Sequence, residues 1–338
     1  MTGFDALLQE KKVLLADGAT GTNLFAMGLQ SGEAPERWTL DHPDKIQALH
    51  SSFVEAGSDL FLTNTFGGTR YRLALHGLDT DTKAVNLKAA QLAKQVAQSA
   101  GRPVIVAGSV GPTGELIEPL GKISFDDAKA AFSEQIEGLV EGGVDVIWIE
   151  TISAPEELRA AVEAAQQFDL PVCATMSFDM SGRTMMGLTP AQLVTMADEL
   201  ELDGFGANCG VGVSDLMGSV LAMKAEPRAA QTPVIAKANC GIPRFQDDKI
   251  VYDGTTDVMA DFAVLARAAG ASVIGGCCGT TAQHVRAMRD ALDDPSNSGN
   301  LAVLAINKAL GSMSEGAQAL AEGKQQSGPK RRVRARRG

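Results

Sequence analysis

The chain has 338 residues, of which 45% are hydrophobic and only 5% aromatic, so one or two domains with an aliphatic core are expected. Its net charge is −11, and without the six basic residues of the segment 330–338 it is −17, which argues against a nucleic-acid-binding surface. Five cysteines, an odd number, no apolar run near the roughly 20 residues of a membrane span and no signal-peptide pattern predict a cytoplasmic protein without disulfides or a membrane partner.

Short apolar runs recur along the chain, and a stretch with helical periodicity follows each of them. Nearly continuous apolar runs of this length are typical of parallel strands that are buried on both faces. The predicted strands are 13–16, 60–63, 104–107, 144–149, 172–176, 205–207, 234–236 and 271–274. The predicted helices are 44–57, 82–100, 126–142, 154–167, 190–201, 214–226, 256–269 and 281–293.

Eight strand–helix pairs predict an α/β protein with a (β/α)₈ (TIM) barrel as a single domain over residues 1–295. The alternative is a doubly wound open sheet, but the first turn, DGATGTN at 17–23, lacks the dinucleotide-binding spacing. Three helix starts resemble capping boxes: Thr189 with Gln192, Ser153 with Glu156, and Thr280 with Gln283.

The segment 296–338 differs in composition from the rest of the chain. It is rich in Ser, Gly, Asn and Ala and then becomes low in complexity, so we expect one helix near 301–310 and a disordered basic end. The terminal KRRVRARRG could contact RNA or an acidic partner, but a solvated terminus is the simpler interpretation.

Functional side chains of a (β/α)₈ barrel lie at the C-terminal ends of its strands. The residues at these positions are Asp17, Gly18, Asn64, Thr65, Phe66, Gly111, Pro112, Thr113, Glu150, Ser177, Asp179, Asn208, Cys209, Asn239, Cys277 and Cys278. Because all the strand ends meet at one mouth, three cysteines that are distant in sequence are expected to converge there.

The motif GGCCGT at 275–280 places Cys277 and Cys278 between glycines, whose freedom lets both side chains turn inward. Together with Cys209 they would leave one tetrahedral position of Zn²⁺ open, as in catalytic sites. Three thiolates suit a zinc that binds a substrate thiol and keeps its sulfur nucleophilic. The alternatives are buried structural cysteines or a vicinal disulfide; Cys173 is interpreted as structural and Cys240 is left open.

Two further positions suit a substrate that is also an amino acid. Glu150 follows the apolar run VDVIWIE, where a carboxylate either pairs with a cation or is functional, so it could bind an ammonium group or form a salt bridge. The turn of Asp17, Gly18 and Ala19 offers backbone amides for a carboxylate.

A series of motifs covers most of the chain from Leu14 to Leu292: DGATGT at 17–22, TNTF at 63–66, GSVGPTG at 108–114, ET at 150–151, GRTMMG at 182–187, GANCG at 206–210 and GGCCGT at 275–280. With these motifs the chain resembles the homocysteine S-methyltransferase family, which includes betaine–homocysteine methyltransferase and the homocysteine-binding barrel of cobalamin-dependent methionine synthase. The resemblance implies a barrel fold, zinc on the three cysteines, and homocysteine contacts from Asp17, Gly18 and Glu150.

For the site as a whole we expect Glu150 and Asp17 to be catalytic, with Glu150 on the amino group of homocysteine. Ala19, Asn208, Thr65 and Trp38 are expected to be further substrate contacts.

The methyl donor is expected to be betaine, because the stretch SGEAPERWTLDHPDK at 31–45 and the length of the chain resemble stand-alone bacterial betaine enzymes. Trp38 and Tyr71 would supply aromatic faces for a quaternary ammonium group. The alternative donors are a corrinoid protein, S-methylmethionine and dimethylsulfoniopropionate. A zinc hydrolase and a redox or metal-storage protein remain open outside this class, as does assembly into a homo-oligomer.

Overall fold

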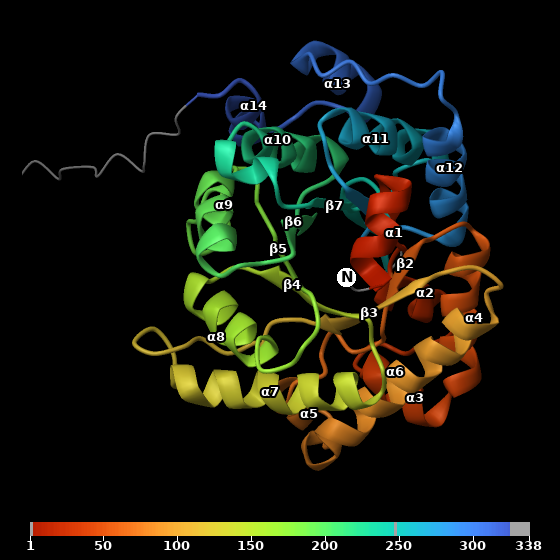
Figure 1. The fold of residues 1–338 in the computed structure, drawn as a ribbon, viewed down its shortest axis with the longest axis vertical. Helices are drawn as coiled ribbons and strands as arrows, with labels where there is room; N and C mark the ends of the chain where they lie inside the picture. Colours follow the sequence, from red (N-terminus) through yellow and green to blue (C-terminus); the bar gives the residue numbers. More distant parts are fainter. Residues whose placement is uncertain (1–2, 247–248, 325–338) are drawn as a thin grey trace, which may run out of the picture.

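The computed structural model describes residues 3–246 and 249–324, which form a (β/α)₈ barrel (Figure 1). Its parallel sheet has the strand order β1-β10-β7-β6-β5-β4-β3-β2, and a bridge between Ala16 and Leu60 joins the two edge strands. The strands are β1 Leu14–Leu15, β2 Leu60–Leu62, β3 Ile105–Val110, β4 Val146–Ile152, β5 Val172–Met176, β6 Gly204–Cys209, β7 Val234–Ala238 and β10 Val273–Gly276. The predicted barrel is confirmed, and the open sheet is excluded.

The helices predicted between the strands are all present, with shifts of a few residues at their ends. They are α4 Pro43–Glu55, α6 Thr82–Ser99, α7 Phe125–Glu141, α8 Pro155–Ala165, α9 Pro190–Glu199, α10 Val213–Lys224, α11 Thr256–Ala268 and α12 Ala282–Asp293. Shorter helices lie in the loops: α2 Gly21–Ala26, α3 Trp38–Asp41 and α5 Arg70–Ala74.

One of the three predicted capping boxes is confirmed, that of Thr189 and Gln192 at the start of α9. The other two are wrong. Helix α8 follows Ala154 and has no side-chain cap, and α12 is capped one residue later than predicted, by Thr281 with His284. Thr280 is instead fully buried in the loop that follows β10, where its amide donates to the carbonyl of Cys277 at 3.1 Å.

Helix α1 (Gly3–Lys11), which was not predicted, lies across the N-terminal end of the barrel (Figure 1). Its buried residues Phe4 and Leu7 join the apolar cluster inside the barrel, which also contains Ile105, Trp148 and Cys173. Trp148 and Cys173 are therefore core residues, as expected. The barrel interior is filled by apolar side chains at this end, whereas the main cavity lies at the opposite end.

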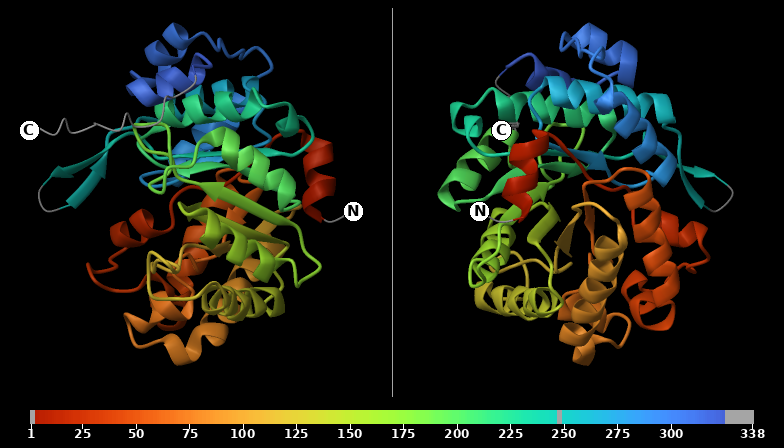
Figure 2. Two further views of the ribbon diagram at one scale, coloured as in Figure 1. Left: turned by 90° about the vertical axis from the view of Figure 1, so that its left-hand side faces the viewer. Right: turned by 45° about the vertical axis from the view of Figure 1, so that its right-hand side comes forward.

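Two further features extend the barrel. The antiparallel hairpin of β8 (Pro243–Gln246) and β9 (Lys249–Tyr252), which was not predicted, projects from the body of the molecule (Figure 2). Helix α13 (Val303–Leu310) confirms the helix predicted near 301–310, and α14 (Glu315–Ala321) is an addition. The basic segment 330–338 lies outside the described residues, and no helix among those described is long and apolar enough to cross a membrane.

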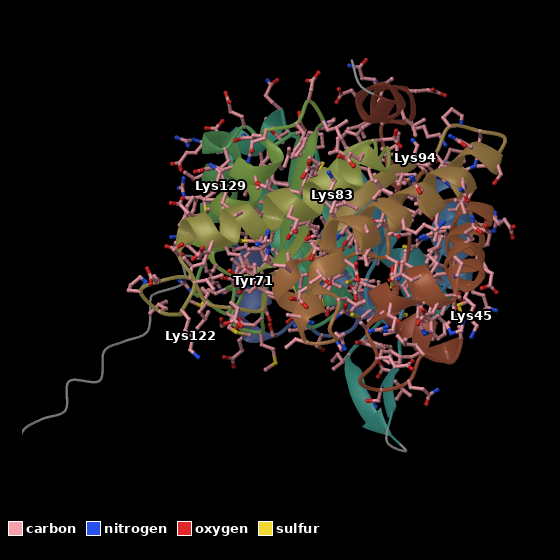
Figure 3. All side chains as sticks on the ribbon, turned by 90° about the horizontal axis from the view of Figure 1, so that it is seen from below. Lys45, Tyr71, Lys83, Lys94, Lys122 and Lys129 are labelled. Atoms are coloured by element: carbon pink, nitrogen blue, oxygen red, sulfur yellow. The ribbon has the colours of Figure 1, made fainter. Side chains whose placement is uncertain are left out.

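The outer helices are joined by ion pairs at their surface. Lys83 of α6 pairs with Glu137 and Glu141 of α7, and Lys129 of α7 pairs with Glu163 of α8. Figure 3 shows Lys83 and Lys129 on this layer of helices. Each such pair contributes little to stability, because both partners are solvated.

Aspartates at the start of three strands repeat one arrangement along the sheet. Asp59, Asp145 and Asp203 lie directly before β2, β4 and β6. Their carboxylates accept backbone amides of the strand that comes one earlier in the chain, those of Leu15 in β1 (2.9 Å), Val106 in β3 (2.8 Å) and Val172 in β5 (2.7 Å). These bonds set the register of each pair of strands at the N-terminal end of the barrel. Asp59 does so where the barrel closes.

Asp59 is also the centre of a charge cluster. Its side chain is 1% exposed and lies 2.5 Å from Lys11, 3.2 Å from Arg289 and 3.7 Å from Arg102. One buried carboxylate therefore holds together the end of α1, the turn before β3 and helix α12.

We predict that Asp59→Asn lowers the free energy of unfolding by about 3 kcal/mol, because three cations lose a buried carboxylate and Arg289 keeps only the exposed Asp293. The matched control is Asp145→Asn, since Asp145 has the same bond to a strand but only Lys94 as ionic partner and is 29% exposed. That change should cost about 1 kcal/mol or less. Urea denaturation measures both, and equal losses would contradict the special role of Asp59.

Candidate metal and substrate site

The three predicted cysteines meet at the C-terminal end of the barrel. The sulfur atoms of Cys209, Cys277 and Cys278 all lie within 4.8 Å of one another, and this is the one group suited to a metal ion among the described residues. Cys209 ends β6, whereas the other two follow β10. Strand β7 lies between these strands in the sheet, so the cluster spans the ends of three strands.

The backbone turns sharply at both contributions to the cluster. Cys209 has φ 60°, which is unusual for a residue with a side chain, and it is followed by Gly210 at φ 75°. In the other loop Gly279 has φ 79°, and a side chain at Gly276 would collide with Thr280. The strained residue and the glycines direct the three sulfurs toward the same point.

Asn239, at the end of β7, connects the two halves of the cluster. Its amide group donates to the carbonyl of Gly210 at 2.8 Å, and its oxygen accepts the backbone amide of Cys278 at 3.1 Å. Its side chain is also hydrogen-bonded to Cys209. Asn239 was predicted only as a residue at the mouth of the barrel. In the structure its side chain links the loop after Cys209 to the loop that carries Cys277 and Cys278.

All five cysteines are unpaired in the structure, and no disulfide joins Cys277 to Cys278. Hydrogen bonds from Cys277 and Cys278 to the sulfur of Cys209 hold the pKa of Cys209 well below its usual range. Cys240, which was left open, lies outside the cluster, because its sulfur contacts Gly254 O at 3.2 Å and His284 Nε2 at 3.3 Å.

Glu150 is directed into the barrel by an irregularity in β4. The register with β5 shifts between Ile149 and Ile152, and Thr151 has φ 62°. Glu150 is 7% exposed, and its carboxylate accepts the hydroxyl of Ser109 at 2.6 Å. Burial raises its pKa to about 7, while Lys237 acts in the opposite direction. Among the described residues Glu150 forms no ion pair, because the nearby Lys237 is paired with Asp17. The structure therefore does not show the salt bridge that was the alternative interpretation of Glu150.

Asn208 was expected to contact the substrate, but it does not line the main cavity. Its amide group donates to Glu150 at 3.3 Å and to Thr151 Oγ1 at 2.7 Å, and lies 3.8 Å from the sulfur of Cys277. Its oxygen accepts the amide of Thr151 at 2.9 Å. Asn208 thus fixes both Glu150 and the cysteine cluster in place.

Asp17 lines the cavity, but both of its oxygens are already bonded. One forms a buried ion pair with Lys237 and the other accepts the amide of Leu62 at 2.9 Å. Burial raises the pKa of Asp17, and Lys237 opposes this effect. Lys237 was missed by the sequence analysis, although a lysine within the apolar strand run VIAKA was a signal of an inward-facing charge.

The turn after β1 differs from expectation in one respect. The backbone amide of Ala19 donates to the carbonyl of Thr280 at 3.0 Å, so it is not available for a substrate carboxylate. Gly18 lies so close to this carbonyl and to Phe53 that a side chain would not fit. The turn lines the cavity, and the absence of a side chain at Gly18 allows the turn to pack against the loop that carries Cys277 and Cys278.

A cavity of about 520 Å³ opens above the cluster, which is within the range of sites for small ligands. The cysteines, Glu150, Lys237 and Thr65 line one part of it. The other part is lined by side chains from the loops after β1 and β2, namely Phe25, Glu33, Glu36, Phe66, Arg72 and His76. Of these only Phe66 was predicted.

Trp38 does not line the cavity, contrary to expectation. It is 5% exposed, and Lys45 lies over its ring at 4.3 Å from the centroid. Tyr71 also lies outside the cavity, packed against the core.

Further predicted mouth residues have structural roles: the hydroxyl of Thr113 donates to the carboxylate of Glu157, and Asp179 accepts hydrogen bonds within its own turn. Gly111, Pro112 and Ser177 are also absent from the cavity lining.

The site therefore combines three soft ligands with a carboxylate whose pKa lies near neutrality and a buried cation. This set suits a small molecule that carries both a thiol and an ammonium group, since thiolates select soft metal ions and the unpaired carboxylate attracts a cation.

Comparison with known proteins agrees with this chemistry. The model of the family described as homocysteine S-methyltransferase matches residues 14–292. The chain is 29% identical over 292 residues to a methionine synthase of Mycobacterium tuberculosis, covering 82% of this chain and 24% of that protein. The chain thus spans about a quarter of the length of this relative.

Solved structures support the fold. The oxidized form of the homocysteine methyltransferase MmuM from Escherichia coli has a TM-score of 0.72 and 24% identity, covering 86% of this chain and 99% of that one. Its metallated form has the same TM-score at 23% identity, covering 85% and 99%. Because the family model matches residues 14–292, most of the chain, this chain belongs to the homocysteine S-methyltransferase family.

Proposed function

We propose that the protein binds zinc through Cys209, Cys277 and Cys278 and transfers a methyl group from betaine to the sulfur of homocysteine, giving methionine. The observation that carries the proposal is the position of the three sulfurs beside Glu150 in one cavity. Family membership supports the acceptor and argues against the zinc hydrolase and metal-storage alternatives.

The donor set fits zinc. Three cysteine sulfurs close to one another are typical soft ligands, and the cavity next to them leaves room for a further ligand. When bound there, zinc would lower the pKa of a substrate thiol and leave its sulfur nucleophilic. Asn208 and Asn239 keep the cysteines in place through hydrogen bonds, as outer residues around metal sites do.

Glu150 orients the acceptor by binding its ammonium group, and Ser109 and Asn208 hold the carboxylate in position for this contact. The turn at residues 18–22 lies against the same cavity and would receive the substrate carboxylate. Holding the substrate at several points turns the transfer into a reaction between positioned groups.

The outer part of the cavity suits a small onium donor. Phe25 and Phe66 offer aromatic faces for a quaternary ammonium, in place of the predicted Trp38 and Tyr71. Arg72 offers a cation for the carboxylate of betaine, and Glu36, whose pKa is raised by burial, lines the same cavity. A bond forms between sulfur and the methyl carbon while the carbon–nitrogen bond breaks; dimethylglycine leaves, and the thiol proton passes to solvent.

A corrinoid-bound methyl group is the second candidate donor. It is favoured by the identity with a methionine synthase and by apolar side chains that are exposed around the mouth, Phe25 at 50% and Ile242 at 54%. Such a donor would approach the same sulfur from outside the cavity.

We predict that Cys277→Ala removes the bound zinc and abolishes methyl transfer, because two sulfurs hold the ion far more weakly than three. Cys240→Ala is the matched control, since Cys240 lies outside the cluster, and it should retain the wild-type zinc content. Metal analysis by mass spectrometry reads this out independently of turnover. A folded Cys277→Ala protein with full zinc content would contradict the assignment.

The ionisation of Glu150 predicts the pH dependence. Its pKa is raised to about 7, so the carboxylate becomes protonated as the pH falls through this value and loses its hold on the ammonium group. We expect kcat/KM for homocysteine to fall about tenfold per pH unit below neutrality. Glu150→Gln should lower activity and abolish this dependence, whereas Glu157→Gln, a buried glutamate outside the cavity, should preserve it.

A donor panel tests the methyl source. Purified protein with homocysteine is supplied separately with betaine, S-methylmethionine, dimethylsulfoniopropionate or methylcobalamin, and methionine is quantified. We expect the highest kcat/KM with betaine, and a loss of about tenfold or more for Arg72→Met with betaine, because its carboxylate loses a cation. Turnover with methylcobalamin alone would replace betaine by the second candidate.

A further inference from the structure

Three charged side chains meet at the inner part of the cavity, and only one of them remains without an ionic partner. Asp17, Lys237 and Glu150 are 1%, 2% and 7% exposed, so all three are removed from bulk water. Lys237 is paired with Asp17, and the second oxygen of Asp17 accepts the amide of Leu62. Glu150 is held by neutral donors, Ser109 and Asn208.

The formal charges of this trio sum to −1, which matches a single substrate ammonium group. Without the lysine the same space would hold two buried carboxylates. Carboxylates that share a buried site cannot both remain ionised, so one of them takes up a proton. The effect of Lys237 therefore reaches Glu150 although the lysine is bonded to Asp17.

We propose that Lys237 is a positioning residue that determines ammonium recognition: by cancelling the charge of Asp17 it leaves Glu150 as the single ionised acceptor for the amino group of the substrate. The inference rests on the proposed function, because the ammonium group is that of homocysteine. It assigns Asp17 a structural partnership with Lys237 in place of the direct substrate contact that the sequence suggested.

A rival role for Lys237 is direct binding of the substrate carboxylate. This role would require its ammonium group to leave Asp17 or to share it, at the cost of a buried ion pair. The two roles make opposite predictions for substrate analogues that lack one charged group. 3-Aminopropane-1-thiol lacks the carboxylate of homocysteine, and 4-sulfanylbutanoate lacks the amino group.

The experiment measures the affinity of the metal-loaded protein for these three thiols by isothermal titration calorimetry. For Lys237→Met we expect Kd to rise about tenfold or more for homocysteine and for 3-aminopropane-1-thiol, and to stay within about twofold for 4-sulfanylbutanoate. The double variant Asp17→Asn/Lys237→Met removes both charges of the pair, so it should recover most of the lost affinity. Lys237→Gln, which keeps a donor toward Asp17, provides a second variant should the methionine variant fold poorly.

Lys224→Met is the control, since Lys224 contacts Ala229 O outside the cavity and its loss should change none of the affinities. Metal content and thermal unfolding are measured for every variant. Weakened binding of 4-sulfanylbutanoate with unchanged binding of 3-aminopropane-1-thiol would overturn the proposal in favour of carboxylate contact. A double variant no better than the single one would also overturn it. If the wild-type protein binds none of the thiols, the proposed function fails as well; wild-type binding with an unaffected Lys237→Met overturns this inference alone.

Discussion

The cysteine cluster depends on the contacts that the end of β7 makes with the strands on either side of it. Cys209 and the pair Cys277–Cys278 come from strands that are not neighbours, and Asn239 occupies the gap between them. Its single amide side chain binds both loops and the sulfur of Cys209. The three sulfurs therefore stay together before any metal arrives, and binding need not assemble the site from separate loops.

The same end of the barrel concentrates backbone strain and buried charge, whereas the other end is filled with apolar side chains and α1. Thr151, which follows Glu150, and Cys209, a member of the cluster, both have positive φ. Glu150, Asp17 and Lys237 are buried a short distance from the cluster. The opposite end also carries the aspartates whose carboxylates bind the backbone of neighbouring strands.

Much of the fold could be predicted because buried parallel strands are written as short apolar runs. The hairpin of β8 and β9 was missed because the segment PRFQDDKIVY at 243–252 is largely polar and its one apolar run, Ile250–Tyr252, has only three residues. The wrong cap of α12 has a local cause: the cysteine loop buries Thr280, so the capping position moves to Thr281. At the site, Trp38 looked like a ligand contact because aromatic side chains near a mouth suit onium ions, but Lys45 and the core already surround it.

The sequence by itself determined the number of barrel strands, the ligand types and the glycines that let two neighbouring cysteines face one point. These properties depend on residue chemistry and local spacing, which a linear chain displays directly. Only the tertiary structure decided which polar groups are already bonded: the amide of Ala19 donates to the carbonyl of Thr280, Asp17 is paired with Lys237, and the amide group of Asn208 donates to Glu150. Hydrogen-bond capacity is shared among residues distant in sequence, so its allocation becomes fixed only when the barrel closes.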